Sequence, residues 1–428
     1  FAPNGVEISN GVIEDVVINA NGAGHGLNLH GSNNVTVNRV DVSNFGKVGI
    51  AIASAADIEI SYTTFATDVY SAWANIGIMW ADSDNYRKNT TGVVLGDGNV
   101  FCDTNPVIYN EEPDLPSSVG EESDRVVSGY EQYGYTLVWR DNTTGTGYEI
   151  GTASYETADG NTYVSLATAV AASEGNPVTL TESTTYRGAA FPLYTAPEAG
   201  AATFSAKSEV SGSATVIDLG GNTLTAYVTS PTIIEGAGSS LTIRNGSLHI
   251  EYAGNNGVGA VIAPKVGGIA TIANVNYTTN GAALYPEGSA AEVNVINSTI
   301  TAPIYAVGTN AGDESHYGIK IRIEGSTLTT TDVDSLPVLI NIPDSLEIKD
   351  STLQGGGRQG LIVRGGSATV ENTTITTLGT YSGNTYLDRT WGSGNEVPLA
   401  AVVVGDRSNA YKYPATLTMT NVSVYAYG

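Results

Sequence analysis

The chain has almost no cysteine and little basic charge. Cys102 is the only cysteine among 428 residues, so no disulfide can form within the chain. Lysine and arginine together number 18 against 43 aspartates and glutamates, which gives a formal net charge of −25. An acidic surface repels phosphate backbones, and we therefore expect no nucleic-acid partner.

Long apolar runs are also missing. No run approaches the roughly 18 apolar residues of a membrane span, so we expect no insertion of this segment into a membrane. Charged residues make up 14% of the chain, whereas ordinary soluble proteins contain roughly 25%. The surface must instead be rich in Thr, Ser, Asn and Gly, which suits an extracellular protein. No leader peptide opens the sequence, and we expect that an export signal was removed or lies upstream.

What the sequence does have is one repeated unit, seen most clearly in SATVENTTIT at residues 367–376. Ala368 and Val370 alternate with polar neighbours as on a half-buried strand, and Ile375 resumes the alternation on the opposite parity. A strand that bends at Asn372 places all three apolar residues inside. Asparagine suits this bend because it tolerates the left-handed backbone conformation.

The unit recurs along most of the chain. The apolar residues two positions before each bend follow one another at steps of 22 to 29 residues, with one step of 49. Such repeats indicate stacked units, and because no copy holds a convincing long helix, we predict coils of short parallel strands. A β-sandwich with Thr-rich strands is the alternative, but it requires frequent hairpin turns. The bend residues, expected to form a ladder whose mutual hydrogen bonds offset burial, are Asn10, Asn245, Asn274, Asn297, Gly325, Asp350, Asn372 and Asn421.

The chain divides into three predicted regions. Residues 1–111 are interpreted as the C-terminal coils of a first β-helix, and residues 112–160 as an acidic linker followed by a Tyr-rich β-meander. Residues 161–428 are interpreted as a second β-helix, opened by a capping helix that starts near Tyr163 and stops at Gly175. The apolar markers of the first β-helix are Ile8, Val37 and Ile60.

Two stretches of the second β-helix carry a resemblance to a known family. TYVSLATAVAASEGNPVTLTEST, from Thr162, is similar to the beginning of right-handed parallel β-helix domains of the pectate-lyase-like superfamily. IDLGGNTLT, from Ile217, and SLTIRNGSL, from Ser240, resemble the first coils of bacterial cell-surface members. The resemblance covers residues 160–428 and, less sharply, 1–111. It implies an all-β, right-handed parallel β-helix solenoid, whereas function varies among lyases, hydrolases, tailspikes and adhesins of this superfamily.

Motifs of a polygalacturonase-like hydrolase are mostly absent. Such an enzyme needs clustered carboxylates to protonate the leaving oxygen and activate water. The chain matches only a Gly-His-Gly tripeptide around His25, and it contains no Asp-Asp pair. We therefore interpret the tripeptide as a chance match.

A lyase mechanism needs a lysine or arginine base, commonly beside calcium. Lys320 and Arg322 are expected on one outward face with His316 just before them, and they are the candidate catalytic residues if the protein is an enzyme. Arg358 and Arg364 are expected to neighbour them. The competing interpretation is a set of solvated charges between inward isoleucines.

Acidic and aromatic residues supply the other candidate sites. Asp82 and Asp84 are candidate ligands of a structural calcium ion, because hard cations prefer carboxylate oxygens. No other cofactor is expected. The 24 tyrosines outnumber the 6 phenylalanines, and tyrosine tolerates a wet surface. The candidate ligand-binding aromatics are Trp73, Trp80, Tyr381, Tyr386 and Trp391. The alternative interpretation is that these side chains cover the lateral groove of the solenoid.

These features favour an exported protein at the bacterial cell surface. We predict an adhesin or structural stalk whose stacked coils present loops to a host or matrix glycan or protein. The alternative is a polysaccharide lyase or glycoside hydrolase, although an acidic surface repels polyuronates. The likeness of residues 77–101 to residues 401–425 predicts that this sequence is a slice of a longer tandem array.

Overall fold

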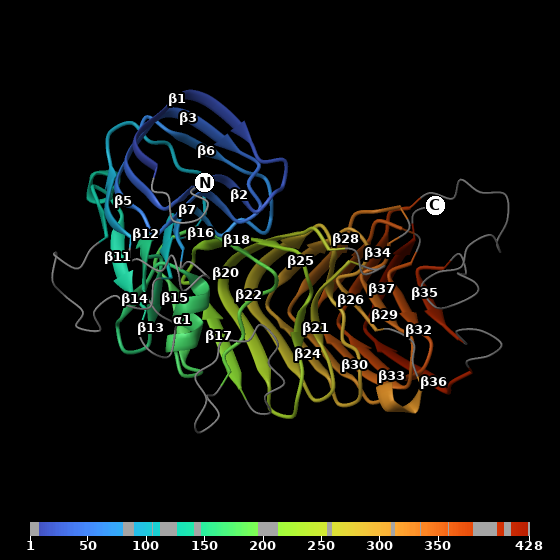
Figure 1. Ribbon diagram of the computed structural model, residues 1–428. Coiled ribbons are helices and arrows are strands. Elements are labelled where there is room, and N and C mark those ends of the chain that lie inside the picture. The colour runs from blue at the N-terminus through green and yellow to red at the C-terminus, as the bar shows by residue number, and fades with distance from the viewer. Residues whose placement is uncertain are drawn as a thin grey trace. The chain divides into compact units, whose positions relative to one another are not determined.

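The structure, a computed structural model, is a β-solenoid. It has about 12 turns and is 4% helical, which confirms the predicted all-β parallel β-helix. The chain forms two compact units, which are described separately, and Figure 1 shows the strands stacked within each. The described residues are 8–79, 90–104, 106–111, 126–140, 147–195, 213–254, 259–309, 313–333, 335–357, 359–379, 400–405 and 412–426.

The first unit spans residues 1–172, 184–189 and 197–205, and two sheets of mainly parallel strands form its coils. One sheet follows the order β1 (Ile8–Asn19), β3 (Ser32–Ser43), β5 (Ala56–Ser61), β8 (Thr91–Leu95) and β10 (Val127–Ser128), with β6 (Thr64–Ala66) beside β3. The other follows the order β2 (His25–His30), β4 (Val48–Ala53), β7 (Ala74–Ile78), β9 (Ile108–Asn110), β12 (Tyr148–Gly151) and β11 (Thr136–Trp139).

The predicted markers of the first unit need one correction. Val37 and Ile60 lie in register, but the partner of Val37 in β1 is Ile13, and Ile8 lies opposite Ser32. The reason is that β1 and β3 each bend twice. The left-handed residues at these bends are Asn10 and Asp15 in β1 and Asn34 and Arg39 in β3.

The Tyr-rich region closes one end of this core. Strands β11 and β12 pair antiparallel, and Trp139 packs edge-on against Tyr148 with ring centroids 5.1 Å apart. Tyr130, Tyr148 and Tyr155 are buried. These three rings therefore fill the interior and cannot offer a platform to a sugar.

The predicted helix is present as α1 (Leu166–Ala172), and Gly175 follows it with φ of 81°. Glu149 of β12 is buried and accepts hydrogen bonds from Ser165 Oγ at 3.0 Å and Thr168 Oγ1 at 2.9 Å, which fixes the start of the helix. Burial raises the pKa of this carboxyl. The remaining elements of the unit are the 3-10 helix η3 (Glu131–Tyr133), β13 (Tyr155–Thr157), β14 (Thr162–Tyr163) and β16 (Thr184–Gly188).

The second unit spans residues 173–183, 190–196 and 206–428. Its shorter sheet has the order β19 (Thr232–Ile234), β21 (Ala260–Pro264), β23 (Ala282–Leu284), β26 (Val307–Gly308), β29 (Val338–Ile340), β32 (Leu361–Val363) and β35 (Val402–Val404), and η4 (Glu314–His316) lies between β26 and β27 in the chain. Its long sheet contains β15 (Pro177–Leu180), β17 (Ala214–Asp218), β18 (Thr223–Val228), β20 (Ser240–Tyr252), β22 (Ile269–Thr279), β24 (Glu292–Ile296), β25 (Thr299–Ala302), β27 (Lys320–Glu324), β28 (Thr327–Thr330), β30 (Asp344–Lys349), β31 (Thr352–Gly355), β33 (Gly366–Glu371), β34 (Thr374–Thr377), β36 (Ala415–Thr420) and β37 (Ser423–Ala426).

Each coil of the long sheet has two arms that meet at the predicted bend. We call the part before the bend the leading arm (β17, β24, β27, β30, β33, β36 and the first halves of β20 and β22). The part after it is the trailing arm (β18, β25, β28, β31, β34, β37 and the second halves of β20 and β22). The predicted bend residues of this unit all have positive φ, from 46° at Asn297 to 61° at Asn245, and the predicted bends are confirmed.

The ladder of bend residues is exposed, so the expectation that it is buried was wrong. Asn372 Nδ2 donates to Asp350 Oδ1 at 2.9 Å, and Asn421 Nδ2 donates to Asn372 Oδ1 at 2.8 Å. The left-handed backbone turns each amide outward, and the next residue points inward instead. A buried hydroxyl ladder fills that place, in which each Oγ bonds a carbonyl two residues back, and its members are Ser298, Ser326, Ser351 and Thr373.

The core of the second unit consists of apolar columns that run through both arms. Ile323 lies opposite Val295 and Ile348 in the leading arm, and Leu328 lies opposite Ile300 and Leu353 in the trailing arm. All six side chains are buried. The sheet therefore holds its coils in a fixed register, which repeats the outward side chains as well.

Candidate functional site

The predicted basic cluster lies on the leading arm. Lys320 and Arg322 are exposed on β27, and Arg322 pairs with the carboxylate of Glu324. Lys320 lies opposite Glu292, and Arg322 opposite Glu347. Acidic residues are thus interleaved with the two basic ones. Such a surface suits solvated ion pairs better than a concentrated base.

The other predicted members of this cluster are arranged differently. His316 lies in η4, and its Nδ1 is 3.1 Å from Asp313 Oδ1. Arg364 is only 2% exposed and donates through Nη1 to Asn341 Oδ1 at 3.1 Å, so its expected place on the basic face is wrong. It follows β32 and points into the interior, where the amide oxygen satisfies it. Arg358 lies outside the described residues.

Of the predicted aromatic residues, the structure describes Trp73. It is half-buried in the first unit, and its ring meets Tyr109 edge-on with centroids 6.1 Å apart. Lys47 Nζ lies 5.7 Å from the centroid of the Trp73 ring. The residues that lie outside the described part of the chain are Trp80, Tyr381, Tyr386 and Trp391.

The predicted calcium ligands Asp82 and Asp84 also lie outside the described residues. Nearby in sequence, Asp103 Oδ1 accepts from Arg187 Nη2 at 3.1 Å. Within the described ranges, no group of three histidine, cysteine or carboxylate side chains is placed to hold a metal ion. No helix in these ranges is long and apolar enough to cross a membrane.

Two other titratable groups fail as catalytic candidates. His25 lies on β2, where burial and the Lys47 ammonium lower the pKa of its imidazole, and no carboxylate contact orients it within the described residues. Asp344, at the start of β30, is only 4% exposed and accepts from the Ile319 N–H at 3.0 Å. Burial raises its pKa to about 7. A ligand at the surface cannot reach this carboxyl.

A constellation that the sequence reasoning missed lies on the trailing arm. His249 Nδ1 is 2.7 Å from Thr278 Oγ1, and His249 Nε2 is 2.8 Å from Glu251 Oε1. Hydroxyl, imidazole and carboxylate in this order also occur in nucleophilic enzymes. Here β20 and β22 are hydrogen bonded to strands on both sides. Their backbone N–H groups are therefore engaged, and an oxyanion site does not follow. The group is suited to binding hydroxyl-rich ligands.

The trailing arm continues this surface as two columns of outward side chains, mostly threonines. The first column is Thr223, Ser247, Asn276, Thr299, Thr327, Thr352, Thr374 and Ser423. The second is Thr225, His249, Thr278, Thr301, Thr329, Gln354, Thr376 and Tyr425. A Thr-x-Thr pattern after several bends is the signal that could have found them.

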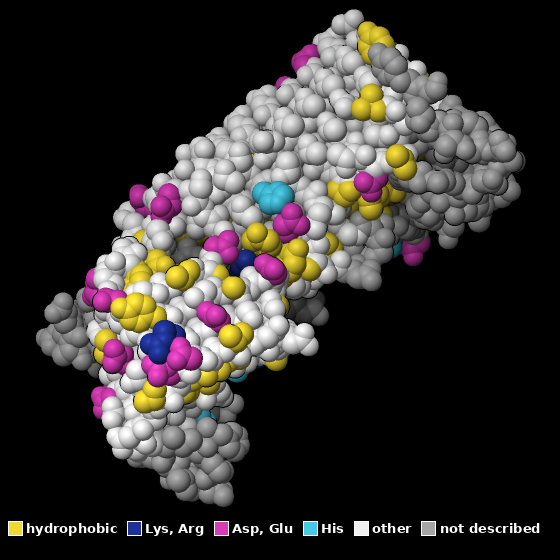
Figure 2. Space-filling model, turned by 90° about the horizontal axis from the view of Figure 1, so that it is seen from above, with side chains coloured by type: hydrophobic (Ala, Val, Ile, Leu, Met, Phe, Trp, Pro, Cys, Tyr) yellow, Lys and Arg dark blue, Asp and Glu magenta, His cyan; other side chains and the backbone are white. Residues whose placement is uncertain are grey.

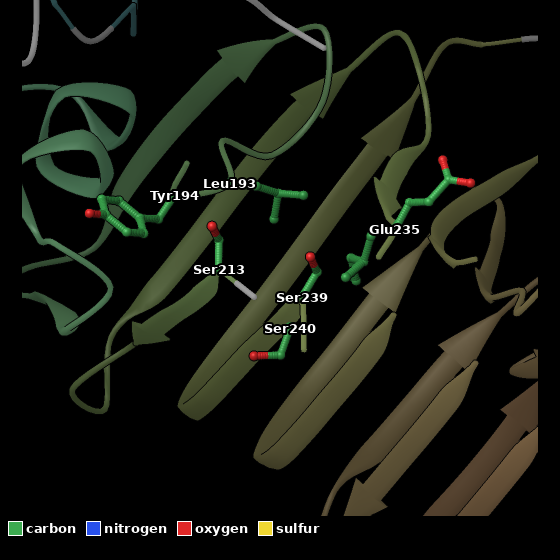
Figure 3. A pocket seen from close by; sticks show the side chains of 7 residues that line it. Leu193, Tyr194, Ser213, Glu235, Ser239 and Ser240 are labelled. Atoms are coloured by element: carbon green, nitrogen blue, oxygen red, sulfur yellow. The ribbon is translucent and has the colours of Figure 1, made fainter. Parts of the chain in front are cut away.

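One pocket in the second unit is small. Its volume of about 10 Å³ is about the room that one water molecule needs. Figure 3 shows Ser213, Ser239 and Ser240 close together while the Glu235 carboxylate points away from them. A sugar ring does not fit there.

Comparison with known proteins adds no assignment. Neither a protein-family model, nor a curated protein sequence, nor a solved structure matches the chain. The proposed function therefore rests on the geometry of this chain alone.

Proposed function

We propose that this chain belongs to an exported bacterial cell-surface protein, an adhesin or stalk of the pectate-lyase-like superfamily. It binds a host or matrix glycan with the surface of its solenoid. The observation that carries this proposal is the trailing arm, whose outward hydroxyls form an open face over successive coils. Figure 2 shows a long stretch of surface in which uncharged polar side chains and backbone dominate.

The distribution of charge supports binding over catalysis. Glycosidases and lyases gather acids or bases within one groove. Here the exposed basic residues of β27 alternate with carboxylates of the same and adjacent strands, and the buried acid of β30, Asp344, is out of reach of a substrate. Half-buried Trp73 offers a further contact for a sugar ring on the first unit.

A screen against polysaccharides and mucin tests the proposal. The chain is applied to immobilised glycans, while soluble glycans are followed for unsaturated products and new reducing ends, with and without calcium. We expect retention on at least one surface and no product. Turnover that Lys320→Ala or Arg322→Ala abolishes would instead establish the lyase alternative and place its site on β27.

The calcium site is a separate part of the proposal. Asp82 and Asp84 would hold a structural ion in the first unit. An ion that binds only the folded state raises the melting temperature of the chain. We expect a rise with calcium over EDTA, which Asp82→Asn together with Asp84→Asn removes; equal melting temperatures would exclude the ion.

A further inference from the structure

The trailing arm carries far fewer charged outward side chains than the leading arm. Its outward side chains from β18 to β37 include a single carboxylate, Glu251. In the same sheet, the charged outward residues of the leading arm are Asp218, Arg244, Glu292, Lys320, Arg322, Glu324, Glu347, Lys349 and Glu371. Threonine favours strands, but strand preference alone does not explain why charge accumulates on one arm and avoids the other.

The two trailing columns are also rigid. Buried inward neighbours such as Ile300 and Leu328 fix the strands, and threonine is stiff at χ1 because it branches at Cβ. Hydroxyls repeat roughly every 4.8 Å from coil to coil and roughly every 6.7 Å along a strand. Little side-chain entropy is lost when an equally regular ligand lies on this face.

We propose that the two trailing columns bind an uncharged polysaccharide in ordered form, with its chains lying along the stack of coils. The inference rests on the proposed glycan-binding function and assigns its site and ligand class. Threonine presents a hydroxyl and a methyl group together, which matches the hydroxyls and C–H faces of a neutral sugar. A polyanion finds almost no cation there.

The interruptions of the columns favour a sugar over a pure water lattice. Asn276, His249 and Gln354 replace threonine at three positions, and each both donates and accepts hydrogen bonds. They break the strict repetition that ice requires, whereas sugar hydroxyls use donors and acceptors alike. Tyr425, which follows Thr376 in the second column, is 50% exposed and offers a ring for stacking.

Adsorption to insoluble polysaccharides tests this assignment. The full chain is incubated with microcrystalline cellulose and with chitin, and polygalacturonate serves as the charged comparison. Thr329→Lys places an ammonium in the centre of the face, and Thr369→Lys on β33 is the matched control in the leading arm. We expect Thr329→Lys to weaken adsorption to cellulose or chitin about tenfold or more because the ammonium is desolvated without a partner. The control should remain within about twofold of the parent.

Thr329→Val retains the shape and removes the hydroxyl, and it should weaken adsorption less than Thr329→Lys. Circular dichroism confirms that each variant is folded.

Equal adsorption of the two lysine variants would overturn the assignment of this face while leaving glycan binding intact. Retention on mucin or polygalacturonate without adsorption to cellulose or chitin would overturn the ligand class. A chain that no surface retains would overturn the proposed function itself. Shaping of ice crystals that Thr329→Lys abolishes, without polysaccharide adsorption, would assign the face to ice.

Discussion

The two arms of each coil in the second unit are alike inside and different outside. Ile323 of the leading arm and Leu328 of the trailing arm are both fully buried on either side of the bend at Gly325. Outward, the same coil shows Lys320 and Arg322 on one arm and threonines on the other. The stack requires only the inward pattern. The outward difference is therefore free to serve binding.

The largest effect should come from the shared interior. We expect Ile323→Ala and Leu328→Ala each to lower the free energy of unfolding by about 2–5 kcal/mol, since both leave a cavity in a packed core. Urea unfolding followed by circular dichroism measures the loss. Thr329→Ala, at a half-buried outward position of the same strand as Leu328, is the matched control and should change it by less than about 0.5 kcal/mol. A Leu328 variant as stable as the parent would show that the trailing arm contributes little to the core.

A pH-dependent difference should arise where the leading arm buries an acid. Asp344 has a pKa of about 7 in the folded chain against a usual 3.8. Below the usual pKa, the Asp344 carboxyl is protonated in both the folded and the unfolded state. As the pH rises towards 7, this carboxyl ionises in the unfolded state first, and the free energy of unfolding therefore falls. Asp344→Asn keeps an oxygen for the Ile319 N–H. It should therefore be more stable than the parent at pH 8 by on the order of 1–3 kcal/mol, and by much less at pH 4.

Urea unfolding at both pH values provides the test of Asp344. Other carboxylates titrate equally in parent and variant, so the difference between the two proteins isolates this group. A difference that does not change with pH would mean that the folded chain already holds Asp344 ionised.

The pattern of buried apolar residues and the bends could be predicted from the sequence. The shift of apolar parity at Asn372 implies a bend, and the structure places such a bend in each predicted coil of the long sheet. Burial of the ladder was mispredicted because a left-handed residue turns its side chain outward, and the buried position falls to the following Ser or Thr. Ile8 is not a valid marker because the repeat pattern predicts one bend per strand, whereas β1 bends twice.

The candidate site was harder to find from sequence. Charged and aromatic residues stand out in the sequence, whereas the contact between His249 and Thr278 joins residues 29 positions apart through the register of two strands. Periodicity reveals that such columns exist. Which outward residues share a column depends on the alignment of coils with unequal insertions, and that alignment required the structure.

The bend itself should contribute a moderate effect. Asn372 has φ of 48°, and alanine in this conformation is disfavoured by roughly 1–2 kcal/mol. We expect Asn372→Ala to destabilise the chain by about that amount and Asn372→Gly by less than about 0.5 kcal/mol, because glycine adopts positive φ freely. Both variants lose the amide bonds to Asp350 and Asn421. Equal losses in urea unfolding would therefore attribute the stability to the ladder bonds and not to the backbone.

The smallest effect should come from the charged face of the leading arm. The side chain of Arg322 is 52% exposed and pairs with Glu324, and exposed pairs of this kind contribute about 0–1 kcal/mol. We expect Arg322→Ala to change the free energy of unfolding by less than about 0.5 kcal/mol at 0.15 M salt, since screening weakens the pair further. Its adsorption to neutral polysaccharide should equal that of the parent. A loss of adsorption with this variant would mean that the two arms bind together, and the division of labour between a charged leading arm and a binding trailing arm would no longer hold.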